Sequence, residues 1–394
     1  KILTGLLLVL IGGWGSLSAQ NVGSNYARQV NTLIGTKGVG LTSGYLYPGA
    51  TYPYGMVQFT PSYFSKRSGF VINQLSGGGC EHMGNFPTFP VKGKLKMSPD
   101  NILNYRINIS EEKGHAGYYE AKVQEDIHAK LTVTERTGMA SYEYPADQQY
   151  GTVIIGGGIS ATPIDQAAIV ITAPNKCEGY AEGGNFCGLR TPYKVYFVAE
   201  FDTDALESGI WKRNELKPNT TFAEGEYSGV YFTFDVNKKK NIQYKIGVSY
   251  VSVENARENL KAENTGWDFL QIQNQAESKW NHYLGKIEVE GTNPDRTTQF
   301  YTHLYRSFIH PNVCSDVNGE YMGADFRVHK SRSKHYTSFS NWDTYRTQIQ
   351  LLSILDPEVA SDIVISHQLF AEEAGGAFPR WVMANIETGV MQGD

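Results

Sequence analysis

The sequence predicts an α+β protein of more than one domain, in which an antiparallel β-sandwich is followed by a helical region. Three observations carry this prediction. Short runs of alternating apolar and polar residues fill the first two-thirds of the chain, and Gly, Pro, Asn and Asp cluster between them. From about residue 254 the apolar spacing becomes helical. At 394 residues the chain is long enough for two domains.

The predicted strands are clearest at two places. In residues 129–136, Leu131 and Val133 lie on one face and Thr132 and Thr134 on the other. Residues 242–250 alternate over nine positions, and residues 195–201 and 230–236 are rich in β-branched and aromatic side chains. Many short strands separated by turn residues favour an antiparallel sandwich over a βαβ fold.

The first predicted helix starts at Thr265, with Asp268 three residues later in an arrangement that resembles a capping box, and ends at Gly285. One apolar face of this helix carries Phe269, Ile272, Ala276, Trp280 and Tyr283. A short strand at 286–290 follows, and then helices without strands between them. We expect helices at about 296–309, at about 342–355, and from Pro357 to the glycines at 375–376.

The N-terminal residues predict export. A basic residue, an apolar run at residues 2–11 and small residues at 16–19 follow one another in the order of a signal peptide. The run is too short to span a bilayer, and a membrane anchor is the alternative. We therefore divide the chain into a signal peptide (1–19), a β-sandwich (20–253), a helical linker (254–290) and the first helices of a second domain (291–394).

Composition narrows the function classes. The net charge is −5, charged residues make up 19% of the chain, and no basic block indicates nucleic-acid binding. Aromatic residues make up 12%, with 25 Tyr, and such flat side chains with a polar edge suit stacking on sugar rings. Secreted β-proteins are often rich in Tyr, so composition leaves both interpretations open.

Four cysteines are present at positions 80, 177, 187 and 314. Export permits disulfides. Cys177 and Cys187 flank a Gly-rich stretch, and we expect them to form a disulfide across it. Their spacing does not match a zinc site.

Four groups of segments hold unusual numbers of Gly, Pro and aromatic residues: VNTLIGT with YPGATYPYGMVQFTP, QLSGGGCEHMGNFPTFP, GHAGYYEAKVQEDIHAKLTVTERTGMASYEYP, and SFSNWDTYRT with GGAFPRWVMANIETGVMQGD. Taken in this order they resemble glycoside hydrolase family 92. The resemblance implies an N-terminal β-sandwich, the start of an (α/α)6 barrel, and an exo-acting, inverting, calcium-dependent α-mannosidase. It implies mannose-containing glycans as partners, α-1,2 linkages in N-glycans or mannan as the expected substrate, and the periplasm or cell surface of a Gram-negative bacterium.

Inverting glycosidases need one carboxylic acid and one carboxylate that activates water. The resemblance places both, and the ligands of Ca²⁺, beyond Asp394. It leaves sugar binding to this chain, and Asp343 is the first candidate because its carboxylate can accept hydrogen bonds from adjacent hydroxyls. Trp342 precedes it, and Arg346 lies on the same predicted helix face, where it can orient Asp343. The alternative is a structural Asp–Arg pair that caps the helix.

The Gly-rich loop is the second candidate, because Gly78 and Gly79 permit close approach of the backbone to a ligand. Cys80, Glu81 and His82 are expected at its tip. The family often has a Trp soon after this Cys, and its absence here puts the linkage preference in doubt. An inverting mechanism needs no Cys nucleophile, and a plain turn is the alternative.

Arg380 and Trp381 form the third candidate, as a pair that stacks on or bonds to the sugar. A Trp buried in a helical core is the alternative. For the protein as a whole, the rivals are a non-catalytic carbohydrate-binding protein and another (α/α)-barrel glycosidase or lyase.

Overall fold

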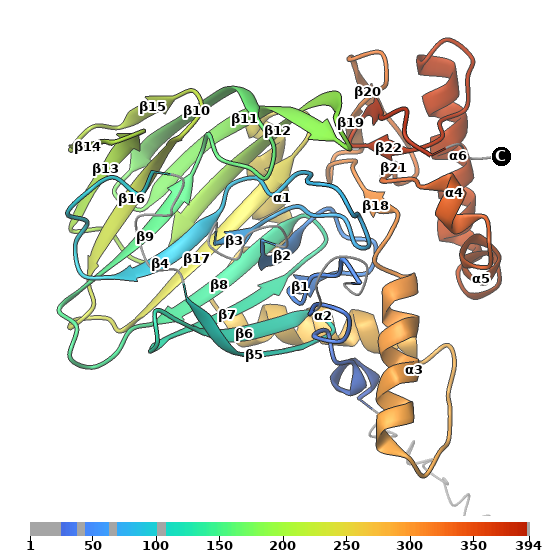
Figure 1. Ribbon diagram of the computed structural model, residues 1–394, viewed down its shortest axis with the longest axis horizontal. Coiled ribbons are helices and arrows are strands. Elements are labelled where there is room, and N and C mark those ends of the chain that lie inside the picture. The colour runs from blue at the N-terminus through green and yellow to red at the C-terminus, as the bar shows by residue number, and fades with distance from the viewer. Residues whose placement is uncertain (1–24, 38–43, 63–68, 101–107, 392–394) are drawn as a thin grey trace, which may run out of the picture.

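The computed structural model describes residues 25–37, 44–62, 69–100 and 108–391. Figure 1 shows two stacked β-sheets on one side and helices with short strand pairs on the other. The predicted signal peptide, residues 1–19, lies outside the described residues, as does Asp394. None of the helices in the described ranges is both long and apolar enough to cross a membrane.

The first sheet has eight strands, all joined in antiparallel pairs. In spatial order they are β1 (Ala50–Thr51), β2 (Gln58–Pro61), β3 (Phe70–Val71), β4 (Thr88–Lys92), β9 (Tyr150–Gly156), β16 (Ser228–Asp235), β13 (Glu207–Lys212) and β14 (Glu215–Pro218).

The second sheet has nine strands and is also antiparallel throughout. In spatial order they are β15 (Phe222–Glu224), β10 (Ile164–Ala173), β11 (Lys176–Phe186), β12 (Leu189–Phe201), β17 (Asn241–Ser249), β8 (Thr137–Glu143), β7 (Ile127–Val133), β6 (Tyr118–Val123) and β5 (Ile109–His115). The predicted antiparallel β-sandwich is therefore confirmed.

Aromatic side chains fill the space between the sheets. Phe201 of β12 lies 4.9 Å from Phe232 and 5.1 Å from Phe234 of β16, measured between ring centroids. The predicted face of residues 242–250 is buried along its whole length. Alternation along the strands directs one set of side chains into this core. Each aromatic pair there adds about 0.5–1.5 kcal/mol of stability beyond the burial of its area.

The end of strand β7, Leu131–Val133, is buried on both faces, and helix α2 (Phe269–Leu284) packs against this strand. The Thr132 hydroxyl donates to the carbonyl of Gly117, in the turn between β5 and β6. A Cβ atom at Gly117, whose φ is +85°, would lie 2.9 Å from Cβ of Ala276 on α2. Only glycine fits there, and it lets the turn and the helix pack directly.

Helices α1 (Val253–Glu263), α2 and α3 (Pro294–Ser307) are each started by a side chain that accepts a backbone N–H. For α2 this residue is Asp268, so the helix begins at Phe269 and the prediction of Thr265 as its cap was wrong. The predicted strand at 286–290 was also wrong. That segment is irregular, and Lys286 in it donates to the carbonyl of Leu355.

Helices α2 and α3 are attached to the edge of the first sheet. The indole N–H of Trp280 donates to the carbonyl of Thr51 over 2.7 Å, and the Thr51 hydroxyl lies 2.6 Å from that of Tyr305. The rings of Trp280 and Tyr305 lie 4.5 Å apart between centroids. These contacts fix the two helices against β1, which lies in the first of the Gly- and Pro-rich segments.

The helix predicted at 342–355 is two helices, α4 (Asn341–Thr344) and α5 (Gln348–Leu355). The chain breaks between them at Thr347, whose φ of 71° is strained for a β-branched residue. Helix α6 (Pro357–Glu373) begins at Pro357 after the Asp356 cap and ends before two glycines, as predicted.

Short strands lie between α3 and α4 and after α6, against the prediction that the helical region has none. They form three antiparallel pairs, β18 (Asn312–Val313) with β21 (Tyr336–Thr337), β19 (Glu320–Met322) with β20 (Val328–Lys330), and β22 (Val382–Met383) with β23 (Ile386–Glu387). Strands of two or three residues are too short to show a period in sequence.

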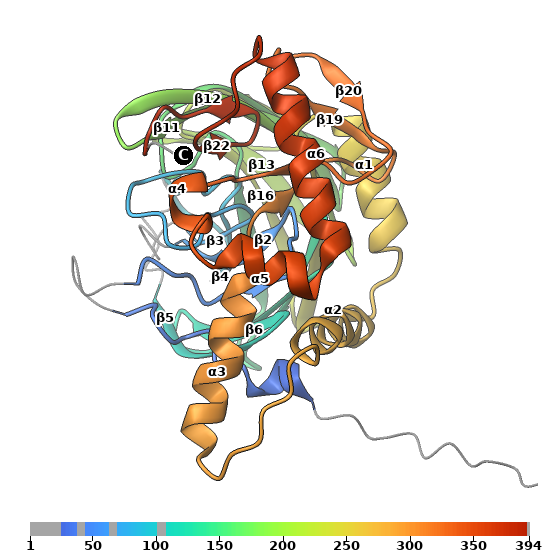
Figure 2. The same ribbon diagram turned by 90° about the vertical axis from the view of Figure 1, so that its right-hand side faces the viewer.

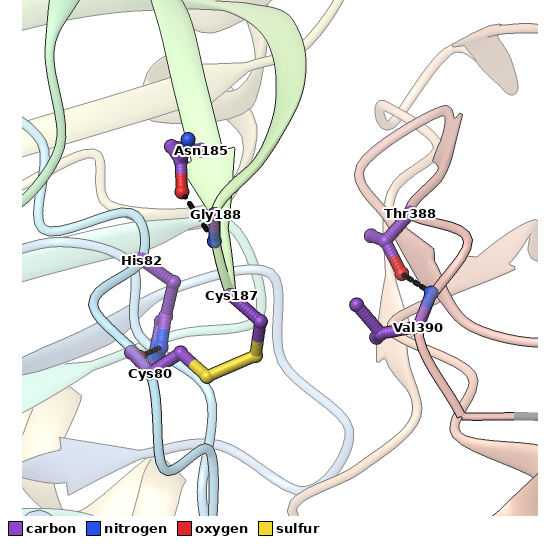
Figure 3. Close-up of a disulfide and its surroundings, with 7 residues drawn as sticks. All are labelled: Cys80, His82, Asn185, Cys187, Gly188, Thr388 and Val390. Atoms are coloured by element: carbon purple, nitrogen blue, oxygen red, sulfur yellow. Dashed lines mark hydrogen bonds between the residues drawn. A yellow bond between two sulfur atoms is a disulfide. The ribbon is translucent and has the colours of Figure 1, made fainter.

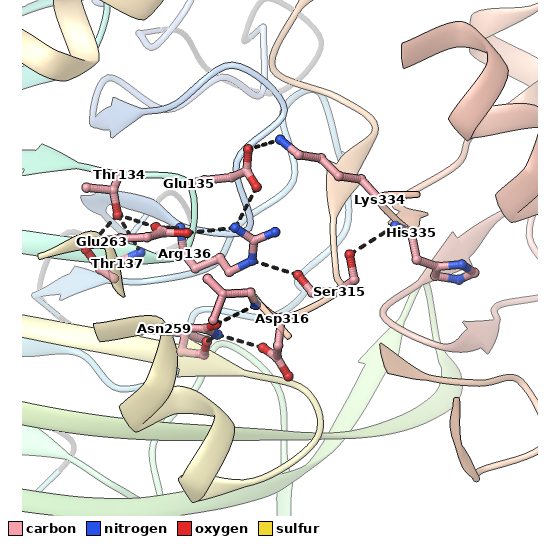
Figure 4. Close-up of polar contacts among 12 residues, drawn as sticks. Thr134, Glu135, Arg136, Thr137, Asn259, Glu263, Ser315, Asp316, Lys334 and His335 are labelled. Atoms are coloured by element: carbon pink, nitrogen blue, oxygen red, sulfur yellow. Dashed lines mark hydrogen bonds and ion pairs between the residues drawn. The ribbon is translucent and has the colours of Figure 1, made fainter. Parts of the chain in front are cut away.

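A buried polar cluster joins the sandwich to the helical region, and we call it the Arg136 cluster (Glu135, Arg136, Glu263, Ser315 and Lys334) (Figure 4). The Arg136 guanidinium pairs with Glu135 and Glu263, each over 2.7 Å, and donates to the carbonyl of Ser315. Lys334 pairs with Glu135 from the other side. Burial would lower the pKa of Arg136, but the two carboxylates raise it overall, so it stays charged.

Asp316, the residue after Ser315, is buried next to this cluster. Its carboxylate accepts hydrogen bonds from the side chains of Ser249, Asn255 and Asn259 over 2.6–2.8 Å. Burial raises the pKa of Asp316, although these three donors oppose the shift. The donors come from the end of β17 and from α1, so the contact fastens the helical region to the second sheet.

Candidate sugar site

Helix α4 carries the first predicted group of site residues. Asp343 is exposed, and one of its oxygens accepts a hydrogen bond from the Ser340 hydroxyl. A carboxylate has about four acceptor positions, so others remain for sugar hydroxyls. The contact with Ser340 holds Asp343 at the first turn of α4, where the sequence placed it.

Arg346 lies beyond the end of α4, because that helix stops at Thr344. Its Nε–H donates to the Tyr345 hydroxyl over 2.6 Å, and its guanidinium carbon lies 5.4 Å from the centroid of the Trp342 ring. Arg346 therefore organises the two exposed aromatic rings rather than the carboxylate of Asp343. Trp342 and Tyr345 offer flat surfaces beside Asp343.

The third predicted group, Arg380 and Trp381, docks on the start of α4. Ser340 forms a β-bridge with Trp381, and the Asn341 backbone N–H donates to the carbonyl of Arg380. The Arg380 backbone N–H donates to Glu387 over 2.7 Å, and the Arg380 Nε lies 3.7 Å from the same carboxylate. Two segments 40 residues apart are thus joined by main-chain contacts.

A disulfide joins the Gly-rich loop to the tip of the β11–β12 hairpin. It links Cys80 to Cys187, with a sequence separation of 107 residues (Figure 3). The predicted disulfide between Cys177 and Cys187 was wrong. The intervening residues form the extended strand β11, and ten residues of strand span about 33 Å. Cys177 is a buried free thiol, and burial raises its pKa.

The hairpin tip also reaches the helical region. The Phe186 ring lies 4.6 Å from that of Trp381 and 5.9 Å from that of His82, measured between centroids. Figure 2 shows α4, β22 and the end of β11 together on one side of the molecule. Phe186 and Cys187 therefore connect the Gly-rich loop to the Arg380–Trp381 segment.

Residues 74–82, here called the glycine loop, hold the second predicted group. Glu81 and Gly79 are exposed, and Gly78 and Cys80 are partly so. His82 is fully buried, and both its ring nitrogens are used inside the loop. Its Nε2 accepts the backbone N–H of Leu75, and its Nδ1 lies 2.7 Å from the carbonyl of Cys80. Burial lowers the pKa of His82 to about 4.

Glycine at position 78 has a direct packing reason. A Cβ atom there would lie 2.8 Å from the His82 ring. The loop therefore closes over this histidine, and its backbone is presented outward at 77–79. Trp381 is also buried, with 6% of its surface exposed. Among the predicted site residues, His82 and Trp381 are therefore buried and cannot face solvent as the exposed candidates do.

A cavity of about 430 Å³ lies between α4, α5 and α6. Its wall includes Asn341, Thr344 and Tyr345 from one side of α4, together with Phe339 and Phe378. Trp342 and Asp343 are not part of this wall. Tyr345 does line this mainly apolar cavity, so the cavity adjoins the predicted sugar contacts.

The described residues do not provide a calcium site. Across the ranges that the structure describes, no three His, Cys, Asp or Glu side chains gather as a ligand set. Ca²⁺ prefers six to eight oxygen ligands. The described residues therefore do not form a set of side chains that fits the ion.

Sequence reasoning missed several supporting residues: Phe186, Cys187, His310, Gln348 and Glu387. All but Glu387 contact a segment far away in the chain, so no local pattern marks them, and Glu387 contacts Arg380 across a short turn. The one available signal was the pair Cys80 and Cys187, because export permits disulfides between any two of the four cysteines.

Comparison with known proteins places the chain in a family. Residues 29–249 match the glycosyl hydrolase family 92 N-terminal domain, and residues 255–394 match the family 92 catalytic domain. The two matches together cover most of the chain, which therefore belongs to glycosyl hydrolase family 92.

Three relatives illustrate this membership. An uncharacterised secreted glycosidase of Arthroderma benhamiae is 26% identical over 387 residues, covering 86% of this chain and 48% of the relative. A family GH92 α-mannosidase from Bacteroides thetaiotaomicron is 24% identical with a TM-score of 0.85, covering 93% of this chain and 52% of that one. A family GH92 inverting mannosidase from Bacteroides thetaiotaomicron VPI-5482 is 24% identical with a TM-score of 0.81, covering 96% and 52%.

The chain thus spans about half the length of the relatives it matches. The likeness to the two solved structures establishes the fold that they share with this chain, a β-sandwich followed by the start of a helical barrel.

Proposed function

We propose that this chain carries the sugar-holding part of an inverting exo-α-mannosidase, and that Asp343 binds hydroxyl groups of the terminal mannose. The observation that carries the proposal is the assembly around α4. An exposed carboxylate lies beside two exposed aromatic rings and is joined to the Arg380–Trp381 segment by main-chain contacts. Carboxylates and flat rings are the groups that bind sugar hydroxyls and sugar faces.

The other predicted residues divide by exposure. Trp342, Arg346, Arg380 and the backbone at 78–81 are proposed contacts of the sugar or of its leaving group. His82 and Trp381 are proposed as supports, since both are buried and packed on Phe186.

The reaction itself belongs to a longer protein in this proposal. The relatives are about twice as long as this chain, and the resemblance assigns the acid, the base and the Ca²⁺ ligands to residues beyond Asp394. In an inverting reaction the acid protonates the leaving oxygen while the base activates water on the opposite face. The role of this chain is then to hold the terminal mannose between them.

The finer assignments rest on the resemblance. They are a preference for α-1,2 linkages, N-glycans or mannan as substrate, dependence on Ca²⁺, and a location in the periplasm or at the cell surface. Export itself is proposed from the signal-peptide pattern at residues 1–19, and the domain division at 254–290 from the change in apolar spacing. The secreted relative of Arthroderma benhamiae supports export.

The test measures binding of methyl α-D-mannopyranoside to the chain by calorimetry, for the wild type and for Asp343→Asn. Loss of a charged acceptor is expected to weaken binding about tenfold or more. Asp295→Asn is the matched control, because Asp295 is likewise an exposed acid in the first turn of a helix, α3. Equal affinities of wild type and Asp343→Asn would remove Asp343 from the site.

A second measurement follows mannose release from α-1,2-mannobiose by NMR, with and without Ca²⁺. We expect the 394-residue chain to bind mannoside without releasing mannose. Turnover by this chain would overturn the placement of the acid and base beyond Asp394. Binding by this chain, with no release by a form extended to the length of its relatives, would favour a non-catalytic carbohydrate-binding protein.

A further inference from the structure

The stem of the glycine loop is held by the loop's own His82 and by two neighbouring segments. The backbone N–H of Leu75 donates to His82 Nε2, that of Ser76 donates to His310 Nε2 over 2.8 Å, and that of Gly77 donates to the carbonyl of Tyr45. Only the second of these anchors comes from the helical region. Three successive amides are thus fixed before the chain reaches the exposed glycines.

The ring of His310 is locked in one tautomer by its contacts. Because Nε2 accepts the Ser76 N–H, the proton lies on Nδ1, which donates to Asn312 Oδ1 over 2.7 Å. The amide group of Asn312 then donates to the carbonyls of Gly55 and Ile309, each over 2.9 Å. These bonds fix the ring plane, so the acceptor at Nε2 points at the loop.

The main chain of His310 is fastened to the opposite side of the site. The Gln348 side chain donates to the carbonyl of His310 and to that of Ser307, each over 3.0 Å. Gln348 is the first residue of α5, directly after the strained Thr347 and the segment that carries Asp343. One residue therefore contacts the glycine loop through its ring and the α4–α5 turn through its carbonyl.

Electrostatics keep the acceptor available. Burial and the nearby charge of Arg306 lower the pKa of His310 to about 4, although the hydrogen bond to Asn312 opposes the shift. The ring is therefore neutral near pH 7, and Nε2 keeps its lone pair. The pKa of His82 is lowered in the same way, and the two rings disfavour each other's charge.

We propose that His310 is a positioning residue of the candidate sugar site, which sets the distance between the glycine loop and the turn that carries Asp343. The proposal rests on the proposed function, because it assigns both segments to one sugar. A histidine that only fills the core is the rival explanation. The two differ in whether a side chain that restores the acceptor, without the imidazole ring, restores the loop.

The test compares His310→Phe with His310→Gln. Phe keeps a ring of similar size but has no acceptor, whereas the Gln carbonyl oxygen lies near the position of Nε2. Hydrogen exchange is followed on a peptide that covers residues 74–82, and a peptide from β17 serves as the reference for global opening. Calorimetry with methyl α-D-mannopyranoside is done on the same samples.

We expect His310→Phe to speed exchange in the loop about tenfold and to weaken mannoside binding by a similar factor, with β17 unchanged. His310→Gln should restore both to within about threefold of the wild type. Wild-type exchange and affinity in the Phe variant would overturn the proposal. Equal loss in Phe and Gln would also overturn it, since that result marks a packing role.

Gln348→Met tests the other half of the contact if His310→Phe does not fold. It removes both hydrogen bonds from α5 and leaves the Ser76–His310 bond in place. We expect weaker mannoside binding with unchanged loop exchange, and unchanged binding would overturn the proposal. Absence of mannoside binding by the wild-type chain would defeat the proposed function, and loop exchange would then decide alone whether His310 anchors the loop.

Discussion

At the scale of single residues, two buried histidines, His82 and His335, and the half-buried His310 contribute to the acid sensitivity of this molecule. His82 and His310 are neutral and bonded to backbone amides. His335 is neutral and stacked on Tyr321, with 3.7 Å between ring centroids, and its Nδ1 has no hydrogen-bond partner among the described residues. Burial, followed by the charges of His329 and His367, lowers the pKa of His335 to about 3.

These shifts predict that stability falls as pH decreases below about 6.5, the ordinary pKa of histidine. In that range the unfolded chain binds protons that the folded chain cannot, so acid favours unfolding. The decrease in stability ends near pH 4 for His82 and His310 and near pH 3 for His335, where the folded chain also binds the proton. Urea unfolding at pH 7, 5.5 and 4.5 should show a steady decrease in the free energy of unfolding.

His335→Phe isolates one of the three contributions. Phe keeps the stack on Tyr321 and removes an unpaired buried nitrogen, so stability at pH 7 should be unchanged or higher. Between pH 6.5 and 4.5 the slope should become shallower by up to about 1.4 kcal/mol per pH unit. His128→Gln, at an exposed position, is the control and should keep the wild-type slope. Parallel curves for wild type and His335→Phe would contradict the prediction.

Residue-level prediction from sequence succeeded where the signal was local. Asp343 lies in the first turn of a helix, as the segment around it indicated, and Arg380 and Trp381 lie close to that turn. His310 was not predicted, because the amide it holds is 234 residues away. A lone histidine before a proline carries no mark of such a contact.

At the scale of elements, periodicity explains which predictions held. The long strands were predictable because one face is buried over many residues, as in β17. The break between α4 and α5 was not, since neither Gly nor Pro marks Thr347. The disulfide was assigned to the wrong pair because Cys177 to Cys187 reads as a loop but forms an extended strand.

The Cys80–Cys187 disulfide should stabilise the fold chiefly by restricting the unfolded chain. It closes a segment of 107 residues, for which loop entropy alone predicts up to about 4.7 kcal/mol, and disulfides typically contribute about 2–4 kcal/mol. The double variant Cys80→Ser/Cys187→Ser should lose that amount in urea unfolding. Reductant should bring the wild type to the same midpoint and leave the double variant unchanged.

Thiol counting gives an independent check of this pairing. The denatured, unreduced chain should show the two thiols of Cys177 and Cys314, which are free in the structure. A wild-type unfolding midpoint that does not respond to reductant would contradict the Cys80–Cys187 disulfide. Free thiols at positions 80 and 187 in the unreduced chain would contradict it as well.

At the scale of the whole molecule, the candidate site depends on how the sandwich and the helical region are held together. The glycine loop belongs to the first and α4 to the second, so a shift between them alters the site. The Arg136 cluster ties the β7–β8 turn to the end of α1 and to the segment after β18. It is the most buried of the ionic contacts across this boundary among the described residues.

Arg136→Met should therefore destabilise the protein strongly. Removing one partner of a buried ionic contact leaves the others uncompensated and costs about 3–5 kcal/mol. Arg190→Met is the matched control, because Arg190 also pairs with a carboxylate, Asp165, but is 71% exposed, so its loss should cost at most about 1 kcal/mol. In urea unfolding, a cooperative protein shows a lower midpoint with unchanged slope, whereas uncoupled halves show a reduced slope. A similar loss of unfolding free energy in the two variants would show that the Arg136 cluster does not hold the sandwich and the helical region together. A reduced slope for Arg136→Met alone would show that this arginine makes them unfold as one unit.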